Sequence, residues 1–164
     1  MIIDPVYDFR FDSGGKDPDL HSLTLKKYHK FIWSKKSPYG FEAQVIENPN
    51  GYLSFLVSGQ KFPVSSDSIS NSLRSYSRTK EIMQAFPDEL INQFIESGSK
   101  IGGYIIFPSN RIAGKMTING ARGFNNRICD RFDLTLECIR LFYIDKSNPL
   151  STVLENNRKF FDVF

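Results

Sequence analysis

The chain has 164 residues, with 21 lysines and arginines against 18 aspartates and glutamates. Hydrophobic residues make up 40% and charged residues 24%, which excludes disordered, collagen-like and membrane-spanning proteins. This length and composition predict one domain over residues 1–164. No basic, apolar leader opens the sequence, and its two cysteines are too few for a disulfide framework, so we expect a cytoplasmic protein.

The first part of the chain is expected to hold one helix, then a hairpin, then two more helices. After an irregular acidic segment, Asp17-Pro18 is a good helix start, and apolar spacing carries this helix to about Ser34. Residues 41–57 predict a β-hairpin around Asn-Pro-Asn-Gly. Asp67 can cap a helix continuing toward residue 76, and another helix is predicted over residues 87–97.

In the C-terminal half, a short apolar run at residues 101–107 predicts a buried strand, and a second strand is expected near residues 116–119. A long helix is then predicted over residues 126–144, and a last one begins at Asn148-Pro149. The fold class is therefore α+β: a small antiparallel sheet, made of the hairpin and both short strands, packed by four or five helices.

Aromatic residues are abundant, with 15 Phe, 7 Tyr and 1 Trp. Their spacing mostly favours the core, and the alternative is that some are exposed to stack on bases. The C-terminal Phe-Phe-Asp-Val-Phe is expected to pack onto the domain.

The first group of candidate functional residues lies in residues 8–21, which contain four carboxylates, two cations and a histidine. Such carboxylates can hold a hard cation or form an acid–base pair, although they can equally be a solvated turn with a helix cap. His21 is the preferred acid–base residue. His29, beside Lys26, Lys27 and Lys30, is assigned to a basic helix face. The residues of this group are Asp8, Arg10, Asp12, Lys16, Asp17, Asp19 and His21.

The second group is a segment with five cations and no acid, residues 98–128. Its glycines and asparagines let a backbone approach an anion and offer amide donors, so it suits a phosphate. The alternative is a glycine-rich connection whose arginines pair with the acidic opening. The expected phosphate-binding residues are Arg111, Lys115, Asn119, Arg122 and Asn125.

The third group lies on the predicted long helix, where charged residues recur at steps of three and four. An exposed salt-bridged face explains most of them, and Asp133 is the member selected as catalytic. Arg131 is a candidate partner for carboxylates. If the acidic opening is functional, Asp8, Arg10, Asp12 and Asp17 should converge with these helix charges.

Two sequence blocks resemble a bacterial family of unknown function. The first is D-x-R-x-D-S-x-G-K-D-P-D-x-H-S from Asp8. The second is T-I-N-G-A-R-G-F-N from Thr117, followed by D-R-F-D-L-T-L-E-C-I-R from Asp130. The resemblance implies no activity, and it suggests that this chain is a C-terminally short member.

Three functions compete. The first is a ribonuclease-like protein of a phage or mobile element, with His21 as acid or base and with Asp17, Asp19 or Asp133 orienting it or holding Mg²⁺. The second is a non-catalytic inhibitor, similar to anti-CRISPR proteins, that meets RNA or an RNA-binding complex. The third is an enzyme acting on a phosphorylated metabolite. The sequence does not separate them, nor does it give the oligomeric state.

Overall fold

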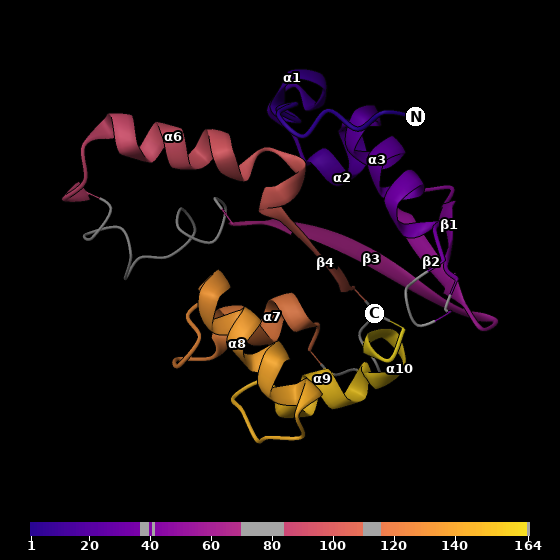
Figure 1. Ribbon diagram of the computed structural model, residues 1–164. Helices are drawn as coiled ribbons and strands as arrows, with labels where there is room; N and C mark the ends of the chain where they lie inside the picture. Colours follow the sequence, from indigo (N-terminus) through magenta and orange to yellow (C-terminus); the bar gives the residue numbers. More distant parts are fainter. Residues whose placement is uncertain (37–39, 41, 70–83, 110–115, 164) are drawn as a thin grey trace.

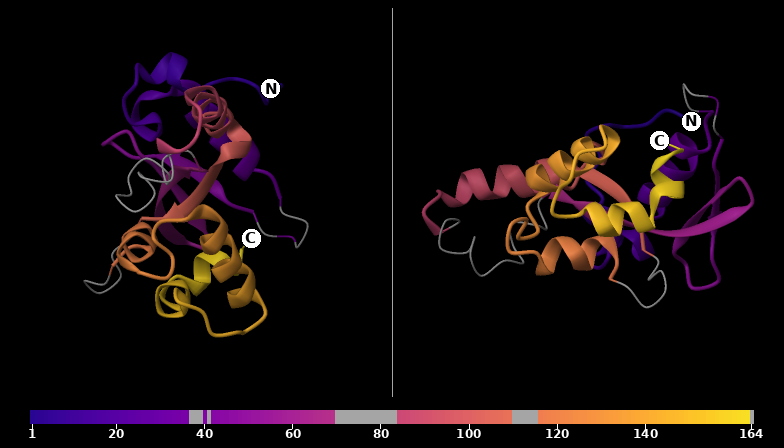
Figure 2. Two further views of the ribbon diagram at one scale, coloured as in Figure 1. Left: turned by 90° about the vertical axis from the view of Figure 1, so that its left-hand side faces the viewer. Right: turned by 90° about the horizontal axis from the view of Figure 1, so that it is seen from below.

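The computed structural model describes residues 1–36, 40, 42–69, 84–109 and 116–163. A four-stranded sheet lies in the middle, with the N-terminal helices on one side and the C-terminal helices on the other (Figures 1 and 2). The helix before the last strand extends away from both groups (Figure 1). The predicted α+β class is confirmed. No helix within the described ranges is long and apolar enough to cross a membrane.

The sheet is antiparallel throughout, in the order β1-β2-β3-β4. The predicted hairpin is present as β1 (Gln44–Glu47) and β2 (Leu53–Val57), joined through Gly51 with a φ of 84°. A two-residue turn follows, in which Ser58 and Gly59 both have positive φ, as a twisted hairpin requires. It leads into β3 (Gln60–Ser68), which pairs with the edge strand β4 (Tyr104–Pro108).

The N-terminal helices are α1 (Arg10–Ser13), α2 (Pro18–His21) and α3 (Leu23–Trp33). The single helix expected here is divided at Ser22, whose hydroxyl accepts a hydrogen bond from the Leu25 N–H at 3.0 Å and so starts α3. Next come α6 (Asp88–Gly98) and the 3₁₀ turn η1 (Ile101–Gly103). The predicted strand at 101–107 thus begins at Tyr104.

The C-terminal helices are α7 (Ile118–Phe124), α8 (Phe132–Tyr143), α9 (Ser151–Asn156) and α10 (Arg158–Phe161). They pack with the sheet around the larger hydrophobic core, and Phe160, Phe161 and Val163 are buried in it. The C-terminal segment therefore packs onto the domain, as expected. A smaller core of Phe9, Leu25 and Tyr28 holds the N-terminal helices together.

Three predicted elements need correction. The strand expected at 116–119 is wrong, because the Thr117 hydroxyl accepts from the Gly120 N–H at 3.0 Å and begins α7. The helix expected from Asp67 is wrong in its first two residues, which belong to β3. Ile69 is helical, and the residues after it lie outside the described ones. The helix at 126–144 begins only at Phe132, because Cys129 and Asp130 adopt positive φ in the preceding turn.

Candidate functional site

In the acidic segment at residues 8–21, two carboxylates fix the starts of helices and a third forms an ion pair. Asp12 accepts hydrogen bonds from the Ser22 hydroxyl at 2.6 Å and the Thr24 N–H at 2.9 Å, which fixes the start of α3. Asp17 caps α2 by accepting from the Asp19 N–H at 3.0 Å. Two of the four carboxylates therefore organise the local backbone.

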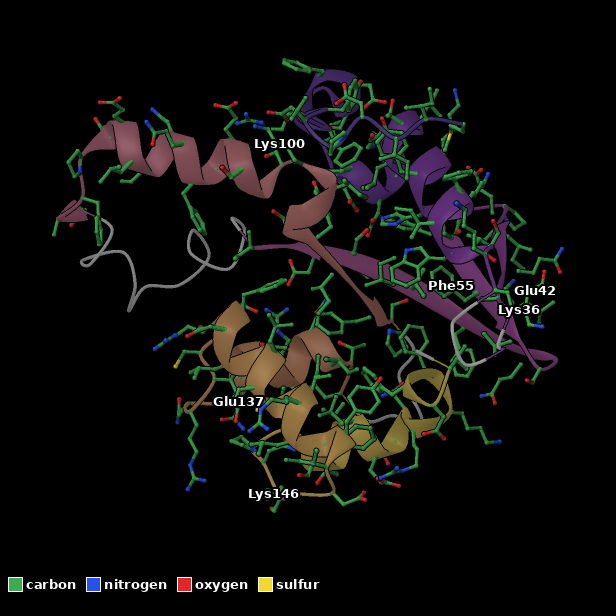
Figure 3. All side chains as sticks on the ribbon, viewed as in Figure 1. Lys36, Glu42, Phe55, Lys100, Glu137 and Lys146 are labelled. Carbon is green, nitrogen blue, oxygen red and sulfur yellow. The ribbon has the colours of Figure 1, made fainter. Side chains whose placement is uncertain are left out.

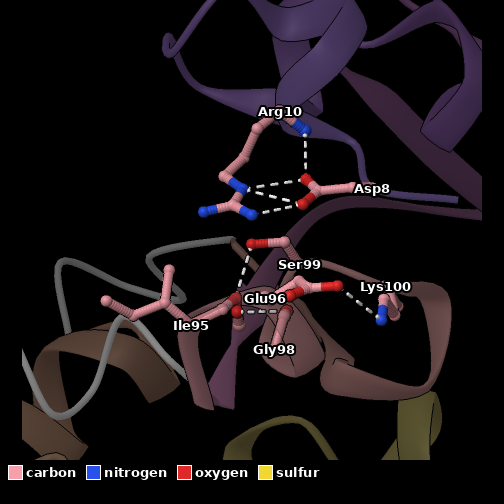
Figure 4. Close-up of polar contacts among 8 residues, drawn as sticks. Asp8, Arg10, Ile95, Glu96, Gly98, Ser99 and Lys100 are labelled. Atoms are coloured by element: carbon pink, nitrogen blue, oxygen red, sulfur yellow. Dashed lines mark hydrogen bonds and ion pairs between the residues drawn. The ribbon is translucent and has the colours of Figure 1, made fainter. Parts of the chain in front are cut away.

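Asp8 forms its ion pair with Arg10, two residues away (Figure 4). The Arg10 Nε–H lies 2.9 Å from both carboxylate oxygens, and this hydrogen bonding holds the Asp8 pKa below its ordinary value. Between them, the buried Phe9 donates its N–H to the Ser99 carbonyl at 3.0 Å. The pair thus lies where the opening segment meets the end of α6.

A chain of hydrogen bonds then joins α2, α3 and β3. Asp19 accepts from the Ser66 N–H at 2.8 Å and from the Ser66 hydroxyl. The same hydroxyl oxygen lies 3.3 Å from His29 Nε2, and Trp33 Nε1 donates to His29 Nδ1 at 3.3 Å. We call Asp19, Ser66, His29 and Trp33 the relay.

The direction of the relay follows from its donors. An indole nitrogen can only donate, so His29 Nδ1 must accept and the neutral ring carries its proton on Nε2. Nε2 then donates to the Ser66 oxygen, and the Ser66 proton points to Asp19. Serine, histidine and aspartate are the residue types of a hydrolytic triad, but here His29 cannot accept the Ser66 proton. The group placed to accept a proton is Asp19.

Burial shifts the pKa values of two ionisable residues in the relay, Asp19 and His29. Burial raises the pKa of Asp19 to about 6, although the Ser66 hydrogen bonds act in the opposite direction. Burial lowers the pKa of His29 to about 4, so this ring is neutral at pH 7. The pKa of the nearby Tyr104 hydroxyl is also raised, by burial and by the charges of Asp19, Asp8 and Asp17. Shifted titrating groups of this kind are typical of functional sites.

The predicted catalytic residues fall in different places. Asp19 is in the relay, Asp17 caps α2, and His21 is exposed at the end of the same helix. Asp133 is exposed on α8, where it pairs with Arg131. The expected convergence of the acidic opening with the α8 charges is wrong. Those charges pair locally, as Glu137 does with Arg140. Figure 3 shows Glu137 on α8, across the sheet from the N-terminal helices.

Three relay residues, His29, Ser66 and Trp33, were not predicted from the sequence as site residues. His29 was assigned to a basic face, yet it is buried, and two of its lysine neighbours bind Glu47: Lys26 at 3.0 Å and Lys30 at 2.8 Å. The available signal was spacing, because His29 lies four residues from both Leu25 and Trp33, on the apolar face of α3. Ser66 lies in a serine-rich stretch with no signal of its own.

The expected phosphate-binding group centres on Arg122, which is fully buried. Its guanidinium donates to Thr135 Oγ1 at 2.8 Å, to Asn119 Oδ1 at 3.2 Å and to the Asp130 carbonyl at 3.2 Å, and it pairs with the Asp67 and Asp130 carboxylates. It makes five acceptor contacts, and a guanidinium has five N–H groups. Arg122 therefore joins β3, α7 and the start of α8.

The other expected phosphate ligands are distributed around this centre. Asn119 accepts from Arg122, and the Asn125 amide donates to the Pro149 carbonyl at 3.2 Å. Arg111 and Lys115 lie outside the described residues. Among the residues that the structure does describe, no three His, Cys, Asp or Glu side chains are placed to share a metal ion.

Removing the Arg122 side chain should strongly destabilise the fold. Arg122→Ala leaves Asp67 and Asp130 without their buried cation, so we expect the free energy of unfolding in urea to fall by about 3–5 kcal/mol. The matched control is Arg140→Ala, which removes an exposed arginine paired with Glu137 and should change the free energy of unfolding far less. Equal losses from the two variants would contradict the structural role of Arg122.

Asp19 and His29 should affect the pH dependence of stability in opposite directions. The Asp19 pKa is raised, so its contribution to stability is complete below 3.8 and is lost as the pH rises through about 6. The His29 pKa is lowered, so its contribution is complete above 6.5 and is lost as the pH falls through about 4. In the wild type the two effects offset each other.

Single variants should separate these effects. Between about pH 7 and 4, Asp19→Asn should lose stability on acidification, whereas His29→Gln should gain it, each by roughly 2–3 kcal/mol since one pKa unit corresponds to about 1.4 kcal/mol. Urea unfolding across this range measures both slopes. Parallel profiles for the wild type and the two variants would show that neither group titrates as described.

Comparison with known protein families gives a match over nearly the whole chain. The model of a family of unknown function, DUF6994, matches residues 3–164, which include both sequence blocks noted above. No curated protein and no solved structure matches the chain significantly. The relay and the Arg122 centre thus lie within the matched region, and the chain belongs to this family of unknown function.

Proposed function

We propose that this protein is a small acid–base enzyme in which the Asp19 carboxyl group transfers a proton to or from a small uncharged or cationic molecule. The observation that carries the proposal is the relay, which ends at a partly accessible carboxyl group with a pKa of about 6. A general base or acid works best when its pKa lies near the operating pH.

The relay supports this role by fixing the carboxyl group. The Ser66 N–H and hydroxyl hold one oxygen each, and His29 Nε2 keeps the Ser66 proton directed to Asp19. Because His29 is neutral, it orients Ser66 without adding a charge that would lower the Asp19 pKa. Pre-oriented groups need no reorganisation when the proton moves.

The surrounding charge supports the substrate class. Asp17 and Asp19 pair with no cation in the described part of the chain. There, the Asp17 carboxylate accepts only from the Tyr52 hydroxyl, at 3.2 Å, and from the Asp19 N–H. Asp8 adds no net charge nearby, because Arg10 pairs with it, so the negative charge comes from Asp17 and Asp19. This negative potential favours a cationic or neutral substrate and repels a phosphate.

The elimination of 5-nitrobenzisoxazole tests the proposal, because it needs one general base. Carbon 3 loses its proton to the carboxylate while the ring N–O bond breaks, which gives a nitrile and a coloured phenolate. We expect a rate that rises with a midpoint near pH 6 and that falls at least about 100-fold in Asp19→Asn. Ser66→Ala should raise the midpoint, because it removes a hydrogen bond that favours the ionised Asp19.

The control for this assay is Asp133→Asn, which removes an exposed carboxylate on α8 and should leave the rate unchanged. Circular dichroism of each variant checks that it is folded. A wild-type rate equal to that of folded Asp19→Asn would overturn the proposal.

Nucleic-acid binding, the function first expected from the sequence, stays a prediction. The observation that favours it is the acid-free segment 98–128, in which Arg127 is exposed and forms no ion pair with the described residues. Its partner would be a structured RNA, bound through counterion release.

Filter binding to such an RNA at two salt concentrations measures the affinity and its dependence on salt. Arg127→Ala and Lys115→Ala should each weaken binding and reduce the salt slope by about one, whereas Arg140→Ala, at an arginine paired with Glu137, should change neither. His21→Ala should preserve binding and remove any cleavage. RNA binding that is absent, or insensitive to salt, would exclude this function.

A further inference from the structure

An apolar cavity of about 220 Å³ lies beside the relay, at the edge strand β4. Residues of α3, β2, β4, α8 and α10 line it; seven of the eleven are aromatic and the other four are isoleucine or leucine. Two of them border the proposed catalytic group: Trp33, which belongs to the relay, and Tyr104, whose pKa is affected by Asp19.

The lining offers few hydrogen bonds to a ligand. The Trp33 N–H donates to His29, and the Tyr143 hydroxyl donates to the Phe161 carbonyl at 2.9 Å. A polar molecule that entered would lose its bonds to water without replacement, at a cost of several kcal/mol in order of magnitude. The cavity therefore selects against nucleobases and sugars and accepts apolar groups.

The size of the cavity limits the range of possible ligands further. A dry, apolar cavity of about 150 Å³ is sufficient to bind benzene. The cavity here is larger, and two of its lining residues, Leu136 and Tyr143, are 46% and 50% exposed, so we infer that it opens to solvent beside them. We propose that it binds a small apolar molecule with one aromatic ring or two fused rings.

This site goes beyond the proposed acid–base function and does not depend on it, because no atom of Asp19 lines the cavity. Binding should therefore persist in Asp19→Asn. A ligand that binds wild type and Asp19→Asn equally, with no elimination activity in either, would leave the cavity site standing and overturn only the acid–base proposal.

Trp33 makes binding directly measurable, because it is the only tryptophan of the chain and its ring lines the cavity. Iodobenzene, whose heavy atom quenches indole fluorescence on contact, is the probe. We expect quenching that saturates, competition by benzene, and an increase in the unfolding temperature with either compound, since a ligand that binds only the folded state stabilises it.

Two rim variants test the position of the site. Leu136 lies within α8 and Ile144 directly follows it; each is 46% exposed, but only Leu136 lines the cavity. Leu136→Arg should weaken iodobenzene binding at least about fivefold by placing a charge at the opening, and Ile144→Arg should leave it within about twofold. Both changes are at exposed positions, so the fold should tolerate them.

A filling variant gives a second test. Ile139→Phe places an aromatic ring in the cavity and reduces its free volume, so it should weaken both the saturable quenching and the benzene-induced stabilisation. Quenching that rises linearly with iodobenzene in the wild type, and equally in Leu136→Arg and Ile139→Phe, would overturn the proposal, because it would show only random collision with an exposed indole.

Discussion

The pleat of β3 places two polar networks on opposite sides of one strand. Ser66 and Asp67 are neighbours, so their side chains point to opposite faces of the sheet. Ser66 meets Asp19 and His29 from the N-terminal helices, while Asp67 meets Arg122 from α7. The acidic and basic groups that the sequence suggested as partners are therefore separated by the sheet. Each group finds its partners on its own side of the sheet.

This separation places Arg122 and Asp19 on opposite faces of the sheet. A nuclease site needs a phosphate ligand and an acid or base in the same cleft, and Arg122 and Asp19 cannot provide one together. Arg122 is a buried cross-link whose loss should be measured as stability. Asp19 retains partial exposure and a shifted pKa, which is why we assign the chemistry to it.

Local signals in the sequence were enough to predict much of the fold. The Asn-Pro-Asn-Gly turn, the apolar spacing of α6 and the apolar run before Pro108 each determine their element without distant partners. Asp67 could not be predicted in this way, because its local sequence suits a helix cap. In the structure it lies in β3 and pairs with the buried Arg122, which is 55 residues away in the sequence. Thr117 was likewise read as part of a strand, although its side chain caps a helix.

The site was harder to predict than the fold, for a related reason. Asp19 could be found as one of several carboxylates, but its shifted pKa depends on burial against β3, and Ser66 gave no signal at all. His29 shows how composition misleads: three neighbouring lysines suggested a surface, whereas its spacing with Leu25 and Trp33 placed it inside. Helical periodicity is the stronger guide when the two disagree, because it reflects which face is buried.

Trp33 connects the two proposals physically. Its ring forms one wall of the cavity, and its N–H fixes the tautomer of His29, which in turn directs the Ser66 proton to Asp19. Without that N–H, His29 Nδ1 would be free to carry the proton, and Nε2 could then accept from Ser66 instead of donating to it. The carboxyl group would lose one of its two donors and its pKa would rise. The apolar wall and the proton direction of the relay therefore depend on the same side chain.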